Sequence, residues 1–183
     1  SIIIHMNKNE FQNQISQFII HDQYDQAFDY LEIYKSKFGK DTFYYLSYSD
    51  LLIQIEDYDR VIQLMEEALH HNRKDPLINE RLADGYFGKK QYEKAQILYQ
   101  QCDINKDNVS ALHIRYMLGL CDMKLKQYPQ AISYFEDVLL DQPENKKALY
   151  YCGIVYGLEN KKVLCNEYLN QYIQLAVHTF YRS

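Results

Sequence analysis

The chain has 183 residues, of which 25 are Asp or Glu and 20 are Lys or Arg, so that its formal charge is −5. This acidic balance argues against a nucleic-acid-binding protein, which needs an excess of cations for the phosphates. No stretch approaches 18 uninterrupted apolar residues, and no transmembrane helix is therefore predicted. With only six glycines and three prolines, the composition favours a helical protein over one built from many short strands.

The first residues stand apart from the pattern that governs the rest of the chain. Residues 1–6 lack the charged start and long apolar stretch of a signal peptide, and His5-Met6 resembles the remnant of a cloning site. We therefore expect residues 1–7 to be an unstructured start and residues 8–182 to form a single domain. A hydrophobic opening strand is the competing interpretation.

Helical periodicity of apolar residues predicts ten helices in five pairs. The first helices of the pairs are expected near 8–21, 42–55, 76–89, 110–126 and 145–159. The second helices are expected near 24–37, 58–71, 92–104, 128–140 and 162–181. Each pair has apolar stripes on more than one face, so it must stack on its neighbours to bury them.

A repeated block lies at the start of each second helix. Its small residue recurs at Ala27, Val61, Ala95, Ala131 and Cys165, and the interval from Ala95 to Ala131 is slightly longer than the others. A nearly fixed period of about 34 residues is typical of stacked repeats. Twelve residues before each of these lie Ile15, Ser49, Ala83, Gly119 and Gly153, most of which are small. We expect them to let the two helices of a pair approach closely.

The fourth copy carries the most complete motif, with Leu118-Gly119, Tyr128, Ala131, Phe135 and Pro143. In this the sequence resembles the tetratricopeptide repeat family. The resemblance implies an all-α fold, a right-handed superhelical α-solenoid of stacked antiparallel helix pairs. It implies repeats at 8–41, 42–75, 76–109, 112–145 and 146–182. Arg115 and Asp122 depart from the motif by replacing aromatic residues, which makes the seam between the third and fourth repeats more polar.

The resemblance also implies a function, because most such arrays bind a peptide or a partner helix in the groove lined by their first helices. The expected role is that of an adaptor, chaperone or assembly scaffold in the cytoplasm. The family's groove positions fall here on Asp50, Glu80, Arg81, Asp84, Tyr116, Met117, Leu120, Tyr150, Tyr151 and Ile154. This groove would be charged in its middle and aromatic towards its C-terminal end. For each aromatic residue, packing within the chain itself is the alternative.

The last predicted helix keeps an apolar pattern to its end. Its predicted interface residues are Tyr172, Leu175, Ala176 and Phe180, and Ile173, Val177 and Tyr181 continue the same pattern. Repeat arrays usually end in a polar capping helix. The alternative function is therefore an oligomerisation or regulatory segment of a larger protein, with this face as its contact surface and a homo-oligomer as one outcome.

The sequence contains no arrangement typical of an enzyme or of a metal or cofactor site. GxSxG, HExxH, GxxxxGK[ST] and GxGxxG strings do not occur, and the cysteines form no CxxC pair. We expect no catalytic residues, no metal and no cofactor, and we expect the thiols to be reduced and buried. A helical RNA-binding repeat of the pentatricopeptide kind is a further alternative, disfavoured by the acidic charge.

Overall fold

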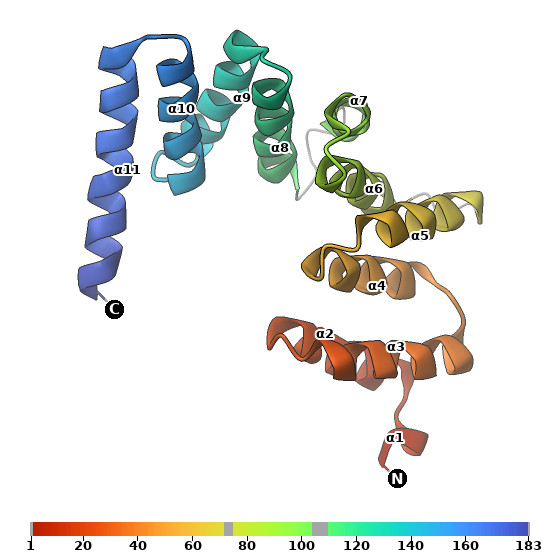
Figure 1. Ribbon diagram of the computed structural model, residues 1–183. Coiled ribbons are helices and arrows are strands. Elements are labelled where there is room, and N and C mark those ends of the chain that lie inside the picture. The colour runs from red at the N-terminus through yellow and green to blue at the C-terminus, as the bar shows by residue number, and fades with distance from the viewer. Residues whose placement is uncertain (1, 72–74, 104–109, 183) are drawn as a thin grey trace. The chain divides into compact units, whose positions relative to one another are not determined.

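The computed structural model describes residues 2–71, 75–103 and 110–182, and within these ranges the chain is helical (Figure 1). The helices are α1 (Ile2–His5), α2 (Lys8–Ile20), α3 (Tyr24–Phe38), α4 (Thr42–Gln54), α5 (Tyr58–His70), α6 (Pro76–Gly88), α7 (Tyr92–Asp103), α8 (Ala111–Lys124), α9 (Tyr128–Asp141), α10 (Lys146–Leu158) and α11 (Lys162–Arg182). Helices α2 to α11 begin and end close to the predicted positions. The prediction of stacked antiparallel helix pairs is confirmed.

Contacts between Cα atoms divide the chain into two compact units, Ser1–Gln91 and Tyr92–Ser183. The division falls between the two helices of the third predicted repeat, so that α6 belongs to the first unit and α7 to the second. The single domain at 8–182 stays a prediction. The predicted end of the third repeat at residue 109 lies outside the described residues.

In the first unit, α4 packs against both α2 and α6, so these three first helices form one layer. The second helices α3 and α5 form the other layer, where α3 contacts α2 and α4, and α5 contacts α4 and α6. The start of this unit differs from the expectation that residues 1–7 are unstructured. Residues 2–5 form a short helix, and Asn7 is part of the fold because its side chain and that of Glu10 form a capping box at the start of α2.

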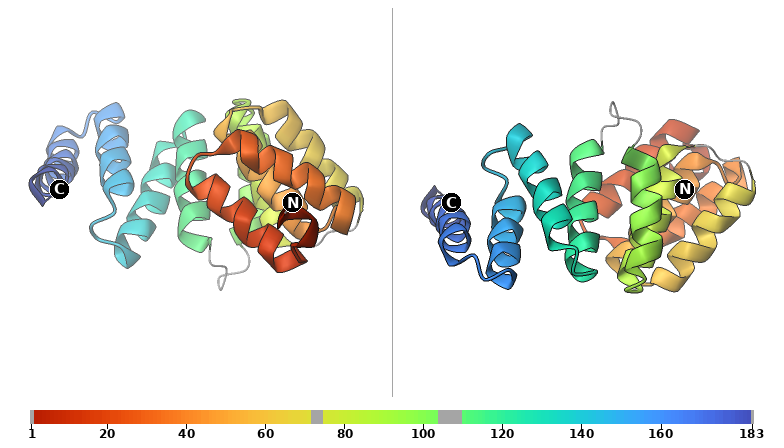
Figure 2. Two further views of the ribbon diagram at one scale, coloured as in Figure 1. Left: turned by 90° about the horizontal axis from the view of Figure 1, so that it is seen from below. Right: turned by 90° about the horizontal axis from the view of Figure 1, so that it is seen from above.

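In the second unit, helices that follow one another in sequence pack side by side from α7 to α11 (Figure 2). Helix α8 lies between α7 and α9, and α10 lies between α9 and α11. The side chains of Cys102, Cys121 and Cys152 are buried, and that of Cys165 is half-buried. None of the described helices is both long enough and apolar enough to cross a membrane.

The turn between the two helices of each pair shows the repeat most clearly. In every pair, one residue adopts a left-handed backbone conformation, with φ between 57° and 61°: Asp22, Glu56, Lys90, Lys126 and Asn160. These residues recur at the same intervals as the repeated block, including the longer interval in the middle of the chain. The amide of the following residue donates to a carbonyl five residues back, as Gln23 does to Phe18, so that the first helix ends in the same way each time.

The small residues predicted to allow close helix contact do so in the second unit. A Cβ atom added to Gly119 would lie 2.6 Å from the ring of Phe135, and one added to Gly153 would lie 2.6 Å from Leu169. Atoms that are not bonded rarely come this close. The glycines therefore set the distance between α8 and α9 and between α10 and α11, as the sequence predicted.

Candidate functional site

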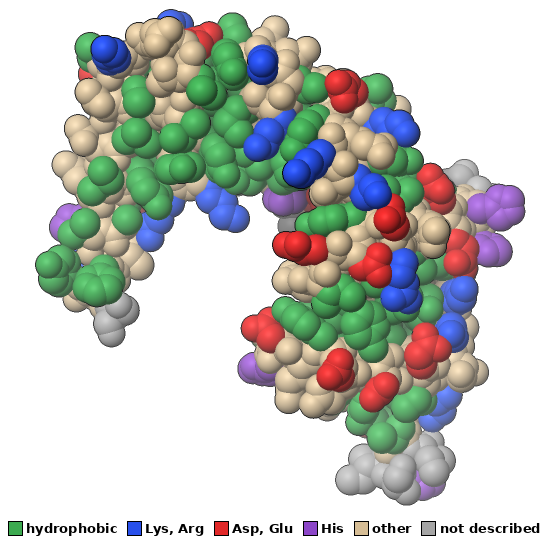
Figure 3. Space-filling model, in the orientation of Figure 1, with side chains coloured by type: hydrophobic (Ala, Val, Ile, Leu, Met, Phe, Trp, Pro, Cys, Tyr) green, Lys and Arg blue, Asp and Glu red, His purple; other side chains and the backbone are tan. Residues whose placement is uncertain are grey.

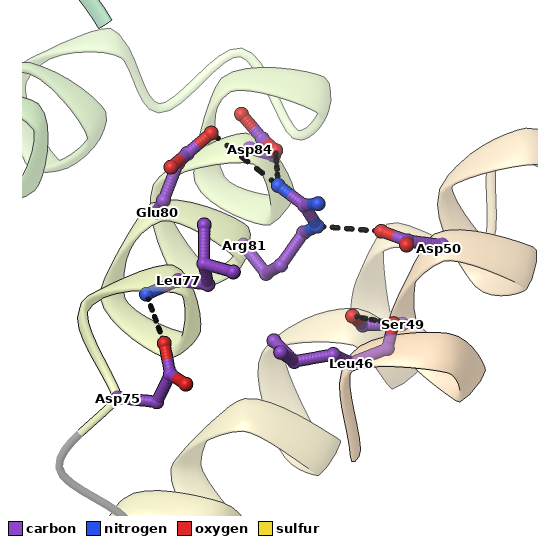
Figure 4. A network of polar contacts seen from close by, with 8 residues as sticks. All are labelled: Leu46, Ser49, Asp50, Asp75, Leu77, Glu80, Arg81 and Asp84. Atoms are coloured by element: carbon purple, nitrogen blue, oxygen red, sulfur yellow. Dashed lines mark hydrogen bonds and ion pairs between the residues drawn. The ribbon is translucent and has the colours of Figure 1, made fainter. Parts of the chain in front are cut away.

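Four of the predicted groove residues form a polar network on α4 and α6 in the first unit (Figure 4). The guanidinium of Arg81 is at the centre: its Nε lies 2.5 Å from Oδ1 of Asp50 on the neighbouring helix. Its Nη1 lies 3.3 Å from Oε1 of Glu80 and 3.8 Å from Oδ2 of Asp84. The sequence placed these four residues in one surface, and the structure brings them together.

The network ties two helices together and fixes the charge of this surface. Burial alone would lower the pKa of Arg81, but Asp50, Asp84 and Glu80 outweigh burial and raise it. Three carboxylates around one guanidinium leave a formal surplus of negative charge, yet the Glu80 side chain is only 3% exposed. Because such paired and desolvated charges hold each other in place, we interpret the network mainly as a clamp between α4 and α6.

The second unit carries a different kind of surface, made of tyrosine rings from three helices. Tyr116 on α8 lies 5.9 Å from Tyr151 on α10, measured between ring centroids. Tyr151 contacts Tyr150 at 5.1 Å, and Tyr150 contacts Tyr172 on α11 at 5.4 Å. These four rings, which we call the aromatic surface, form an unbroken series of edge and tilted contacts. Hydrophobic side chains gather over α8, α10 and α11 in the space-filling view (Figure 3).

The aromatic surface stays accessible although its rings touch one another. Tyr150 is 38% exposed, and Tyr116 and Tyr151 are half-buried. Tyr151 also stacks on the fully buried ring of Phe135, with 5.7 Å between the ring centroids, and this contact fixes the position of the Tyr151 ring. The pKa of Tyr116 is raised by burial and by the neighbouring Tyr151, so that the phenol is neutral at physiological pH.

A cation borders the aromatic surface. The Nζ of Lys147 lies 5.7 Å from the ring centroid of Tyr116, within the range of a cation–π contact. Lys147 is itself exposed. Ile154, one further predicted groove residue, is half-buried two turns of helix along α10 from Lys147. The surface thus combines large rings, one aliphatic side chain and one positive charge.

Two apolar residues of the predicted groove are buried, as Glu80 of the polar network is. Met117 is 9% exposed and Leu120 is 8% exposed, because both belong to the part of α8 that packs against its neighbours. Both residues were predicted to line the groove, and their side chains are buried instead.

The predicted interface at the C-terminal end is displaced by about one residue around the helix. Tyr172, Leu175 and Ala176 are half-buried on the side of α11 towards α10, while Phe180 is 79% exposed. Towards the end of α11, Ile173, Val177 and Tyr181 are exposed together with Phe180. The apolar pattern alone could not show which side of α11 is exposed, because α11 is apolar on both of these sides.

Sequence reasoning missed a hydrogen bond that recurs between repeats. The hydroxyl of Tyr86 donates to Glu66 at 3.2 Å, and that of Tyr156 donates to Glu136 at 2.8 Å. Each pair joins a second helix to the first helix of the next repeat, with the same separation along the sequence. Glu136 also accepts from Tyr168 at 3.1 Å. Comparing equivalent positions of the repeats for a Glu and Tyr pair would have revealed this contact.

In the part of the chain that the structure describes, no group of three or more His, Cys, Asp and Glu side chains is arranged to hold a metal ion. The carboxylates of the polar network surround a guanidinium, and the aromatic surface contains no acid–base pair.

Comparisons with known proteins identify the class of fold. The sequence matches no family model and no curated protein. The structure is similar to PilF of Pseudomonas aeruginosa, with a TM-score of 0.79 and 14% identity over 91% of this chain and 75% of that chain. It is similar to MamA of Desulfovibrio magneticus RS-1, with a TM-score of 0.78 and 16% identity over 92% of this chain and 94% of that chain.

A second MamA, from AMB-1, has a TM-score of 0.69 and 19% identity over 90% of this chain and 96% of that chain. At these identities the likeness concerns the fold. The chain therefore has the tetratricopeptide-repeat fold that its motif predicts.

Proposed function

We propose that this chain is a non-enzymatic protein-binding module, an adaptor, chaperone or assembly scaffold of the cytoplasm, and that the aromatic surface of the second unit is its binding site. The observation that supports the proposal is the series of four tyrosine rings across α8, α10 and α11 with Tyr150 exposed. Large aromatic side chains with few rotatable bonds are frequent among the residues that dominate binding energy.

The chemistry of the surface defines the partner. A helix or extended segment with apolar anchors would cover Tyr150, Tyr151 and Ile154, and the rings hold their positions before binding because each contacts the next. Lys147 at the border favours a carboxylate beside the anchors. The partner segment is therefore apolar with an acidic flank, and the polar network of the first unit serves mainly to hold α4 and α6 together.

The test is selection of peptides from a random display library against the whole chain, followed by measurement of the dissociation constants. Tyr150→Ala should weaken the selected peptides by about tenfold or more, since a central aromatic residue often contributes at least about 1.4 kcal/mol. Lys147→Glu should weaken those with an acidic flank. Tyr181→Ala is the matched control, because it removes an exposed tyrosine of the same unit outside the aromatic surface.

All variants must keep the helical circular-dichroism signal of the native chain. The proposal is wrong if the selected peptides bind Tyr150→Ala and Tyr181→Ala equally well. It is also wrong if the library yields no binder that depends on this surface.

A further inference from the structure

A cleft lies between the start of α10 and the last turns of α11. In Figure 1, α11 continues past the start of α10, which leaves room beside the loop that leads into α10. The cleft has a volume of about 420 Å³. Its lining residues, three of which are basic, are Glu144, Lys146, Leu175, His178, Thr179 and Arg182. We call this site the basic cleft.

The basic cleft is on the side of α11 that faces α10. The Nζ of Lys146 on α10 donates to Oγ1 of Thr179 on α11 at 2.6 Å. The Thr179 hydroxyl donates in turn to the carbonyl of Leu175 at 2.9 Å, and Leu175 is half-buried. An ammonium group has three donors, so this hydrogen bond positions Lys146 at the cleft and leaves donors for a ligand.

The cations at the cleft differ from others of the second unit, such as Lys161, which lies 3.0 Å from Glu159. Among the residues that the structure describes, no carboxylate lies at ion-pair distance from Lys146, Lys147 or Arg182. Lys147 borders the aromatic surface and directly follows Lys146 in the sequence. In a chain with a formal charge of −5, these cations make one edge of the second unit locally positive, and such an edge attracts anionic groups.

The basic cleft adjoins the aromatic surface. Tyr150 on α10 contacts Tyr172 on α11, and these are the last two rings of the series. Lys146 precedes Tyr150 by four residues, and Leu175 follows Tyr172 by three, so each lies about one helical turn away from its ring. Because α10 and α11 are antiparallel, both turns lead in the same direction. The cleft therefore begins about 6 Å beyond the rings.

We propose that the basic cleft binds carboxylate side chains of the same partner segment whose apolar anchors cover the aromatic surface. This inference rests on the proposed function and adds a second subsite to it. Ammonium and guanidinium groups are the usual partners of carboxylates, and Glu144 offsets only part of the positive charge at the cleft. An extended segment advances about 3.3 Å per residue, so its carboxylates follow the last anchor by about two residues.

Nuclear magnetic resonance of the isotope-labelled chain tests the cleft without a known partner. The probe is a peptide of four aspartates with blocked ends, and a peptide of four asparagines is its control. The aspartate peptide should shift the amide signals of Lys146, His178 and Thr179 in a saturable way, whereas the asparagine peptide should not. Raising the salt concentration from about 50 mM to about 500 mM should weaken binding, because salt screens exposed charges. Absence of saturable shifts at these residues would overturn the proposal.

Charge reversal at the cleft tests which cations bind the aspartate peptide. Lys146→Glu and Arg182→Glu should each raise its dissociation constant by at least about fivefold. Lys162→Glu is the matched control, because Lys162 is an exposed lysine that is likewise the first residue of its helix, at the opposite end of the α10–α11 pair. Each variant must keep the helical circular-dichroism signal. Equal weakening by all three variants would show that only the net charge matters and would contradict the proposal.

Two further measurements separate the cleft from other interpretations. Tyr150→Ala should leave the binding of the aspartate peptide unchanged, so a failure of the aromatic surface and a failure of the cleft can be told apart. If a selected peptide with an acidic flank depends on Tyr150 but binds Lys146→Glu as well as the native chain, the cleft alone is refuted. Inorganic phosphate is titrated in parallel. Phosphate that binds at Lys146 and Thr179 more tightly than the aspartate peptide would overturn the assignment to carboxylates.

Discussion

Replacing Gly119 by Ala tests whether the glycines set the spacing of the helix pairs. The added methyl group would lie 2.6, 2.8 and 2.9 Å from three ring atoms of Phe135. That ring is fully buried and is held between Tyr116 and Tyr151, with centroid distances of 6.0 and 5.7 Å. Because the ring has no free space to move into, either α8 must shift away from α9 or the stacked rings must rearrange.

The expected loss of stability follows from two opposing effects. Overfilling a packed core destabilises a protein by about 1–3 kcal/mol. Ala in place of Gly within a helix stabilises it by about 1 kcal/mol. Gly119→Ala should therefore lower the free energy of unfolding by up to about 2 kcal/mol, which for a chain of this length lowers the melting temperature by roughly 4–8 °C.

Gly157→Ala is the matched control for this experiment. It lies on α10 of the same unit, is exposed, and would place its Cβ 3.2 Å from a single sulfur atom, Sγ of Cys165. The side chain of Cys165 has to yield by only a few tenths of an ångström, and it is half-buried, so the melting temperature should stay close to that of the native chain. Thermal unfolding followed by far-ultraviolet circular dichroism measures both variants. If Gly119→Ala is as stable as Gly157→Ala, the close contact does not restrict the packing.

Three further substitutions test other features of the fold by the same thermal unfolding. Burial raises the pKa of Asp122, although the hydrogen bond from Gln96 opposes this, so Asp122→Asn should stabilise the protein at pH 7. The gain in stability over the native chain should shrink as the pH falls from the raised pKa towards the ordinary value of 3.8. A gain that does not change with pH would contradict this. Glu56→Gly should add about 0.5–1 kcal/mol by relieving the left-handed backbone, and a loss would refute it. Glu136→Ala should cost about 2 kcal/mol by removing the acceptor of two tyrosine hydroxyls, whereas the exposed neighbour Asp137→Ala should be neutral, and equal effects would refute this.

Some of the candidate site could be predicted from the sequence, and some could not. The polar network was predictable because Asp50, Glu80, Arg81 and Asp84 occupy repeated positions on neighbouring first helices, and the repeat fixes which helices are neighbours. Met117 and Leu120 occupy similar positions, yet they are buried. Position within a repeat gives the face of a helix, whereas burial depends on how much of that face the two adjacent helices cover.

The sequence by itself determined the helix pairs, their ends and their order. The repeat period and small residues such as Gly119 are local features or are repeated from copy to copy, so each can be recognised without distant contacts. The tertiary structure decided what lies at the surface. The ring series from Tyr116 to Tyr172 and the exposure of Ile173 and Phe180 on α11 depend on which helix packs on which. A long apolar helix has several faces that could be buried, and only the positions of its neighbours decide which face is covered.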